Sequence, residues 1–207
     1  MKTEIKPEDT NRAAAFNLWM KSPMPMVTLV KTLDVSNLCK ISRKKKMKFT
    51  MLMCWCVGKA AAGIEEFMTL PEDGSLFKYD SLAINTIVVN KNGGINSCDV
   101  SFVNDLLQFN DEYQHLTTKV IEEGVSVFKP ESMIIGTSAM VQTELDCIVN
   151  QYTEKFANPM VMWGKYRKGI FKTMLPVSFQ FHHVQMDGMQ GAMFLEKLQE
   201  TIKSLRI

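Results

Sequence analysis

Hydrophobic residues recur along the chain at two spacings, one typical of β-strands and the other of α-helices. Alternating positions and short apolar runs predict strands in five segments: 26–33, two runs within 76–90, 133–141, 160–166 and 170–183. Steps of three and four predict helices in five others: from Asp9-Thr10 to about Met20, 35–41, 50–68, 101–123, and from Asp187 onward. The last helix carries the apolar stripe Leu195, Leu198, Ile202 and Leu205. Segment 50–68 is apolar almost all round and is therefore expected inside a domain.

This mixture of elements predicts an α/β fold, a two-layer sandwich of a mixed β-sheet with helices. The sequence contains no internal repeat, no low-complexity tract and no linker rich in proline or glycine. We therefore expect residues 1–207 to form a single domain.

Composition and charge narrow the range of partners. Hydrophobic residues make up 46% of the 207 positions and charged residues 22%, which is the balance of a globular protein and excludes a disordered one. The net charge of +2 gives no sign of a nucleic-acid or membrane partner, so neither is expected. One basic run, 43–48, is interpreted as a solvated turn, and the alternative is local attraction for a phosphate-bearing ligand.

The cysteines and the apolar runs bear on the compartment. Five scattered cysteines and no secretory leader favour reduced thiols in the cytoplasm. The apolar stretches fall short of the roughly 20 residues that a membrane-spanning helix needs.

The strongest chemical candidate is the segment 176–188, which ends a predicted strand. Alternation places Val177, Phe179, Phe181 and His183 on one face of that strand and sends His182 to the other. A partly desolvated imidazole stays uncharged near neutral pH, so His183 is suited to act as a general base. A purely structural histidine is the alternative. A metal site is not expected, because adjacent strand histidines diverge and the chain has only three histidines.

An ordered set of motifs gives the chain a resemblance to the chloramphenicol acetyltransferase family. The segment 181–188, FHHVQMDG, resembles the family's HHxxxDG active-site motif. Further similarities follow the family's order over nearly the whole chain: Asn11-Arg12 with Phe16, Glu72 to Leu76, Tyr79-Asp80-Ser81, Thr137-Ser138-Ala139, Gly164-Lys165-Tyr166 and Leu175-Pro176. HxxxD alone is a weak signal, whereas the ordered set is a strong one.

The resemblance implies an enzyme with no bound cofactor that uses acetyl-CoA as co-substrate. His183 would take a proton from the acceptor hydroxyl, which attacks the thioester directly, and Ser138 would stabilise the oxyanion. Asp187 would pair with Arg12 and hold the strand-to-helix turn. The family implies a homotrimer with active sites between subunits and, where chloramphenicol is the acceptor, a role in antibiotic resistance.

Several positions depart from the family pattern and leave the acceptor open. The resemblance places Leu18, Trp19 and Met162 in the acceptor pocket, where Leu18 replaces an aromatic residue and Met162 a threonine. A second resemblance, around Asp187-Gly188 and 191–195, is to the catalytic domains of dihydrolipoyl acyltransferases. A non-catalytic protein that binds a small molecule on the same scaffold is the remaining alternative.

Overall fold

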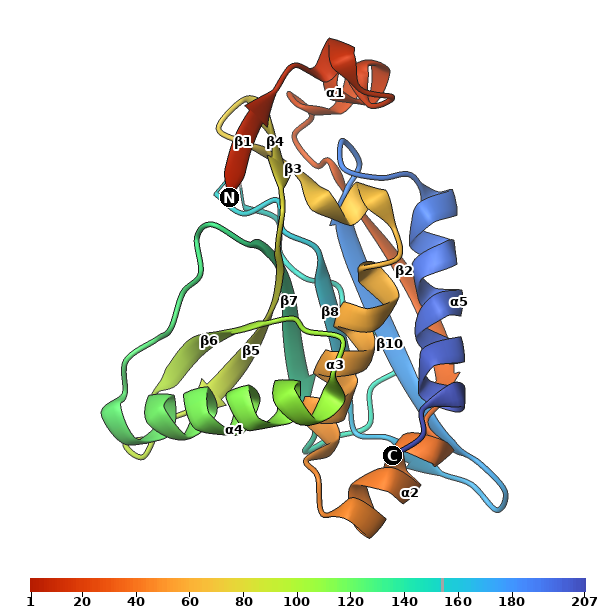
Figure 1. The fold of residues 1–207 in the computed structure, drawn as a ribbon. Helices are drawn as coiled ribbons and strands as arrows, with labels where there is room; N and C mark the ends of the chain where they lie inside the picture. The colour runs from red at the N-terminus through yellow and green to blue at the C-terminus, as the bar shows by residue number, and fades with distance from the viewer. Residues whose placement is uncertain (154) are drawn as a thin grey trace.

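Two β-sheets organise the chain, and the computed structural model describes residues 1–153 and 155–207 (Figure 1). The small sheet has the order β1-β4-β3, from β1 (Lys2–Ile5), β4 (Ser75–Tyr79) and β3 (Thr69–Glu72). The large sheet has the order β2-β10-β8-β7-β5-β6, with β9 (Arg167–Lys168) beside β10. Its strands are β2 (Met26–Asp34), β10 (Thr173–His182), β8 (Met160–Gly164), β7 (Met133–Met140), β5 (Leu82–Val89) and β6 (Ile95–Ser101). The β5–β7 and β7–β8 pairs are parallel and the others antiparallel, so the sheet is mixed, as predicted.

The α-helices are α1 (Ala13–Trp19), α2 (Ser36–Lys45), α3 (Phe49–Ala61), α4 (Leu106–Glu123) and α5 (Gly188–Ser204), with short 3-10 helices at Pro7–Asp9 and Glu65–Met68. Helices α3, α4 and α5 pack on the large sheet and make the second layer of the sandwich, whereas α1 has no buried residue. In Figure 1, α3 and α5 lie in front of the large sheet. Phe179 of β10 packs there against Phe67 and against Phe194 of α5. The predicted two-layer α/β sandwich is confirmed.

The helix predicted over 50–68 was too long, because α3 ends at Ala61. The chain must turn after Gly63 to begin β3 at Thr69, and it does so through a 3-10 helix. The apolar pattern nevertheless continues, since Ile64 and Phe67 are both buried in the core. The pattern reported burial correctly, but burial alone does not distinguish one helix from a helix followed by a turn.

The basic run begins inside α2 and is not only a turn. Arg43, Lys44 and Lys45 occupy the last turn of α2, where cations interact favourably with the helix dipole. Lys46 then ends the helix in the left-handed region, at a φ of 55°. The interpretation as exposed surface holds, and the boundary was wrong by about one helical turn.

The large sheet is covered on its second face as well, by a segment that includes Ile148 and Asn150. The backbone N–H of Ile148 donates to Ser178 Oγ at 2.8 Å, and Gln180 Nε2 donates to the carbonyl oxygen of Asn150 at 3.1 Å. Ser178 and Gln180 are consequently buried, although they point away from the helices. We call this side of the large sheet the helix-free face.

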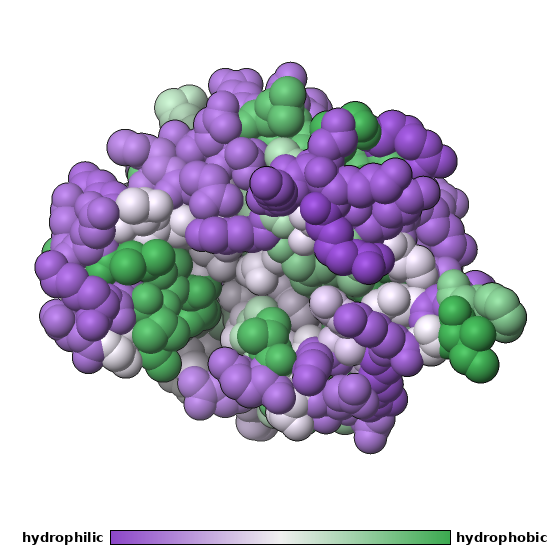
Figure 2. Space-filling view, turned by 90° about the horizontal axis from the view of Figure 1, so that it is seen from below, coloured by the Kyte–Doolittle hydropathy of each residue, from purple (hydrophilic) through white to green (hydrophobic). Residues whose placement is uncertain are grey.

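The surface mixes hydrophilic residues with separate hydrophobic groups. Figure 2 shows the end of the molecule seen from below, where purple residues surround a paler hollow and a green group stands out at the right-hand edge. Ile170 and Phe171, in the turn between β9 and β10, are more than nine-tenths exposed. Within the described part of the chain, no helix is both long enough and apolar enough to cross a membrane.

Candidate active site

His183 lies directly after the last residue of β10. Its backbone N–H donates to the carbonyl oxygen of Pro25 at 2.8 Å, which extends the pairing of β10 with β2 by one position. Its ring stacks on the indole of Trp19, with ring centroids 4.8 Å apart and planes inclined by 5°. The side chain is 29% exposed, so the ring is held on one side and remains accessible.

The two ring nitrogens of His183 differ in their surroundings. Nδ1 is 3.2 Å from Asp187 Oδ1, but the contact lacks the alignment of a hydrogen bond, and Nδ1 itself is closed off from solvent. An acceptor molecule cannot reach Nδ1 there. Of the two ring nitrogens, Nε2 is therefore the one that is not closed off.

Arg12 fixes the turn that carries His183. Its guanidinium donates to both carboxylate oxygens of Asp187, at 2.7 and 3.0 Å, and to the carbonyl oxygens of His183 and Val184, at 2.8 and 2.9 Å. Arg12 is 6% exposed, and its hydrogen bonds hold the pKa of Asp187 below the usual value. Asp187 also caps α5 in a capping box with Gln190.

His182 has a different environment from its neighbour, as the strand alternation predicted. Its Nδ1 accepts a hydrogen bond from the backbone N–H of Val184 at 3.1 Å, so this nitrogen carries no proton. Burial, with a smaller effect of His183, lowers the pKa of His182 to about 4. His182 therefore stays neutral and shapes the turn.

Ser138 lies on β7, on the helix-free face of the large sheet. In the strand register it is opposite Met162 of β8, and Met162 is opposite Ser178 of β10. Thr137, the residue before it, contacts Cys54 of α3 and so points to the helices. Ser138 is half-buried.

Within one chain, Ser138 and His183 are far apart. His183 is five residues beyond Ser178, whose strand is two positions from β7. At about 3.3 Å per residue and about 4.8 Å between strands, their Cα atoms are about 19 Å apart. The predicted site residues thus form two groups: one around His183, with Trp19, Arg12 and Asp187, and one around Ser138.

The three residues expected in the acceptor pocket do not lie together in one chain. Trp19 covers one face of the His183 ring, whereas Leu18 is 69% exposed on α1. Met162 is buried beside Ser138. The structure therefore divides this set between the two groups.

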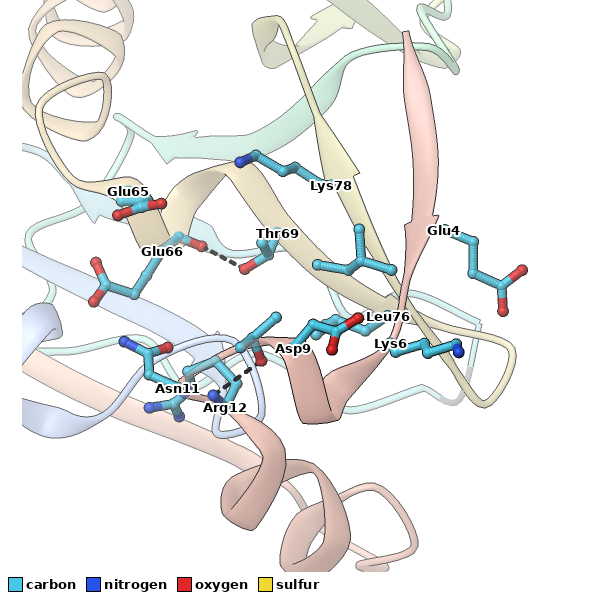
Figure 3. Close-up of a pocket in the computed structure, with 12 residues that line it drawn as sticks. Glu4, Lys6, Asp9, Asn11, Arg12, Glu65, Glu66, Thr69, Leu76 and Lys78 are labelled. Atoms are coloured by element: carbon cyan, nitrogen blue, oxygen red, sulfur yellow. Dashed lines mark hydrogen bonds between the residues drawn. The ribbon is translucent and has the colours of Figure 1, made fainter.

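Two cavities lie near these groups, and they differ in which of the predicted site residues are beside them. One, of about 320 Å³, opens on the helix-free face and is lined by Gly136 and Met160, which lie two residues along their strands from Ser138 and its partner Met162. The other, of about 710 Å³, lies between the N-terminal segment and the 3-10 helix at 65–68 (Figure 3). Arg12 lines this larger cavity, but neither His183 nor Ser138 does, so we do not assign it to the reaction.

Sequence reasoning did not identify the polar residues of the smaller cavity, Gln180 and Asp99 among them. Gln180 carried a usable signal, because a glutamine in a strand buried on both faces needs hydrogen-bond partners. Asp99 carried none, since β6 was not predicted as a strand. The described residues contain no group of three His, Cys, Asp or Glu side chains that could hold a metal ion.

Comparison with known proteins agrees with this architecture. A family model described as chloramphenicol acetyltransferase matches residues 2–199. Chloramphenicol acetyltransferase 3 of Escherichia coli is 26% identical over 187 residues, which cover 86% of this chain and 85% of that protein. The chloramphenicol acetyltransferase of Staphylococcus aureus is 24% identical, over 97% of this chain and 96% of that protein.

Solved structures show the same fold. A chloramphenicol acetyltransferase superposes with a TM-score of 0.84 at 20% identity, over 98% of this chain and 100% of that one. A truncated catalytic core of the 2-oxoacid dehydrogenase multienzyme complex of Thermoplasma acidophilum gives 0.71 at 14% identity, over 98% and 99%. Fold and comparisons together support an acyltransferase. Because the family model spans almost the whole chain, the protein belongs to the chloramphenicol acetyltransferase family.

Proposed function

We propose that the protein transfers an acetyl group from acetyl-CoA to the hydroxyl of a small molecule. Nε2 of His183 takes the proton of the hydroxyl as its oxygen attacks the thioester carbonyl carbon. The Ser138 hydroxyl donates to the resulting oxyanion. Collapse of the tetrahedral intermediate breaks the carbon–sulfur bond, and the departing thiolate recovers the proton from the imidazolium. The products are the acetyl ester and free coenzyme A.

The separation of His183 and Ser138 carries the second part of the proposal. Two groups about 19 Å apart cannot act on one carbonyl, because each must be within about 3 Å of the reacting atoms. The His183 side chain is 29% exposed, and Ser138 is only half-buried, so both remain accessible. A site that uses both takes His183 from one copy of the chain and Ser138 from another. We propose a homotrimer, as the family resemblance implies.

A third cavity, of about 520 Å³, suits the phosphates of acetyl-CoA. Lys165, Lys168 and the aromatic ring of Tyr166 line it, and Tyr166 packs against Phe49 at the start of α3. Cations and the N-terminus of a helix both favour phosphate. Trp163 and Gly164 also line the cavity, and they lie one and two residues along β8 from Met162, the register partner of Ser138.

Chloramphenicol is a candidate acceptor because the relatives above are named for it, and in that case the function would be antibiotic resistance. Dihydrolipoyl groups are the alternative acceptor class, since acyltransferase cores share the fold. We propose that the protein acts in the cytoplasm, where acetyl-CoA is available.

Mixing two inactive variants tests the proposal. Release of free coenzyme A from acetyl-CoA is measured with chloramphenicol, a panel of alcohols and dihydrolipoamide. We expect Ser138→Ala to lower kcat by about 10²–10³-fold and His183→Ala by several orders of magnitude, while both still assemble.

The two variants are then dissociated together and reassembled. A site between copies regains activity, because some interfaces combine an intact His183 with an intact Ser138. The control is the double variant His183→Ala/Ser138→Ala, reassembled with itself. Near-normal turnover of His183→Ala would refute the catalytic proposal, and turnover that never recovers in the mixture would refute the shared site.

A further inference from the structure

Residues that are opposite one another on neighbouring strands form a row across the helix-free face, and one such row has polar side chains at both of its ends. From β10 to β6 the row runs through Gln180, Met160, Gly136, Asn85 and Asp99, each opposite the next. All five line the cavity of about 320 Å³, which is large enough for a small ligand. The row lies two residues from that of Ser138, which places the cavity beside the proposed oxyanion donor.

At one end of the row is a buried carboxylate without a counter-ion. Asp99 is 3% exposed, and its oxygens accept from Asn85 Nδ2 at 2.7 Å and from the backbone N–H of Lys129 at 2.8 Å. No described lysine or arginine forms an ion pair with it. A buried charge is costly unless it is paired, so this position favours a cation supplied by the ligand.

At the other end is a buried acceptor with no donor. Gln180 is 1% exposed, and its Nε2 donates to Thr28 Oγ1 and to the carbonyl oxygen of Asn150, at 3.2 and 3.1 Å. The carbonyl of Asn150 can only accept, which fixes the orientation of the amide. Gln180 Oε1 then has no hydrogen-bond donor among the described residues. One end of the cavity therefore lacks a positive charge beside Asp99, and the other lacks a hydrogen-bond donor for Gln180 Oε1.

Apolar and aromatic side chains line the cavity between these ends. Met26, Ile134 and Met160 contribute aliphatic surface, and Phe128 and Phe156 are both 67% exposed at the cavity. Such a wall accommodates a hydrocarbon stem, and an aromatic face stabilises a nearby ammonium group. An uncharged aliphatic alcohol would leave Asp99 unpaired, and an anion would be repelled by it.

We propose that the acceptor is an ammonium-bearing alcohol, whose cationic nitrogen pairs with Asp99 while its hydroxyl is presented for acetylation beside Ser138. This assignment rests on the proposed function and gives its acceptor a chemical class. Asp99 acts by positioning the acceptor and takes no part in the proton transfer.

The test compares two alcohols of similar length, 5-aminopentan-1-ol and hexan-1-ol, at pH 7, where the amine is charged. For the unaltered protein we expect kcat/KM to be at least about tenfold higher for the amino alcohol, as one charged hydrogen bond implies. Asp99→Asn should bring the ratio to within about twofold of one. The amide can keep both contacts, because Asn85 can turn its own amide over and accept from it. The control, Asp146→Asn, removes an equal charge from a highly exposed carboxylate and should leave the ratio unchanged.

Two results would overturn the assignment: equal kcat/KM values for the two alcohols, or a preference that survives Asp99→Asn. Ligand-detected NMR without acetyl-CoA separates this failure from that of the proposed function. If neither alcohol releases coenzyme A, binding of 5-aminopentan-1-ol that is lost in Asp99→Asn supports the ligand class and refutes the acetyl transfer. Absence of binding and of turnover with the amino alcohol refutes the ligand class.

Discussion

Arg12 offers the sharpest test of what holds His183 in place. We expect Arg12→Ala to lower the free energy of unfolding by about 3 kcal/mol. Removing one partner from a buried ion pair costs about 3–5 kcal/mol. Water can reach Asp187, whose side chain is 48% exposed, and this reduces the cost. The variant also removes the donor from two carbonyl oxygens, those of His183 and Val184, at about 1–3 kcal/mol for each one that stays buried.

Arg167 provides a matched control. It also contacts two carboxylates, those of Glu144 and Asp146, but its side chain is 41% exposed, and exposed pairs contribute about 0–1 kcal/mol. Asp187→Asn should fall between the two arginine variants, since an amide oxygen can keep one hydrogen bond to Arg12. Urea unfolding followed by circular dichroism, at one fixed protein concentration, measures all three.

The result that refutes this reasoning is an Arg12→Ala variant no less stable than Arg167→Ala. A second measurement tests whether Arg12 also holds His183 in position. At a temperature where Arg12→Ala is fully folded, coenzyme A release should still be slower than for Arg167→Ala, because the carbonyl oxygen of His183 has lost its anchor.

Two further predictions concern His182 and the glycines of α5. His182 has a pKa of about 4 when folded and about 6.5 when unfolded, so the unfolded chain binds the proton first as pH falls. The free energy of unfolding should drop by up to about 3 kcal/mol between pH 6.5 and pH 4. Urea unfolding midpoints measured over this range should fall less for His182→Asn than for the unaltered protein. An equal fall would contradict the lowered pKa of His182. Gly191→Ala should destabilise by about 1–3 kcal/mol, because its Cβ would lie 2.7 Å from the ring of Phe181, whereas Gly188→Ala, with open space around its Cβ, should cost nothing.

The sequence predicted elements best where one periodicity runs without interruption. The stripe Leu195, Leu198, Ile202 and Leu205 is buried as expected, with Leu205 one residue beyond the end of α5, and the strand 26–33 matches β2 to within one residue. The short strands β1 and β3 and the strand β6 were not predicted. The partner of β1 is β4, more than 70 residues away, and local spacing does not report such pairing. By contrast, β3 pairs with β4 and β6 with β5 across short turns, so these two strands were missed although their partners are their neighbours in sequence.

The sequence predicted a set of candidate site residues but not how these residues are arranged relative to one another. Alternation placed His182 and His183 on opposite sides, and their different environments follow from it. The distance between His183 and Ser138 depends on strand order, because β8 separates β7 from β10 in the sheet and local spacing does not report which strands become neighbours. The stacking of Trp19 on His183 depends on where the N-terminal segment returns to the end of β10.

Several side chains hold the turn that carries His183, in addition to the backbone hydrogen bonds of the strand that leads to it. Arg12 holds its backbone and Asp187 from outside, His182 holds the N–H of Val184 from inside, and Gln190 completes the cap of α5. The position of the imidazole is therefore set by the turn and by the segment before α1. The helix-free face, where Asp99 lines the cavity, belongs to other strands. A substitution on that face, such as Met162 where the family has a threonine, can therefore change the proposed acceptor without moving His183, the proposed base.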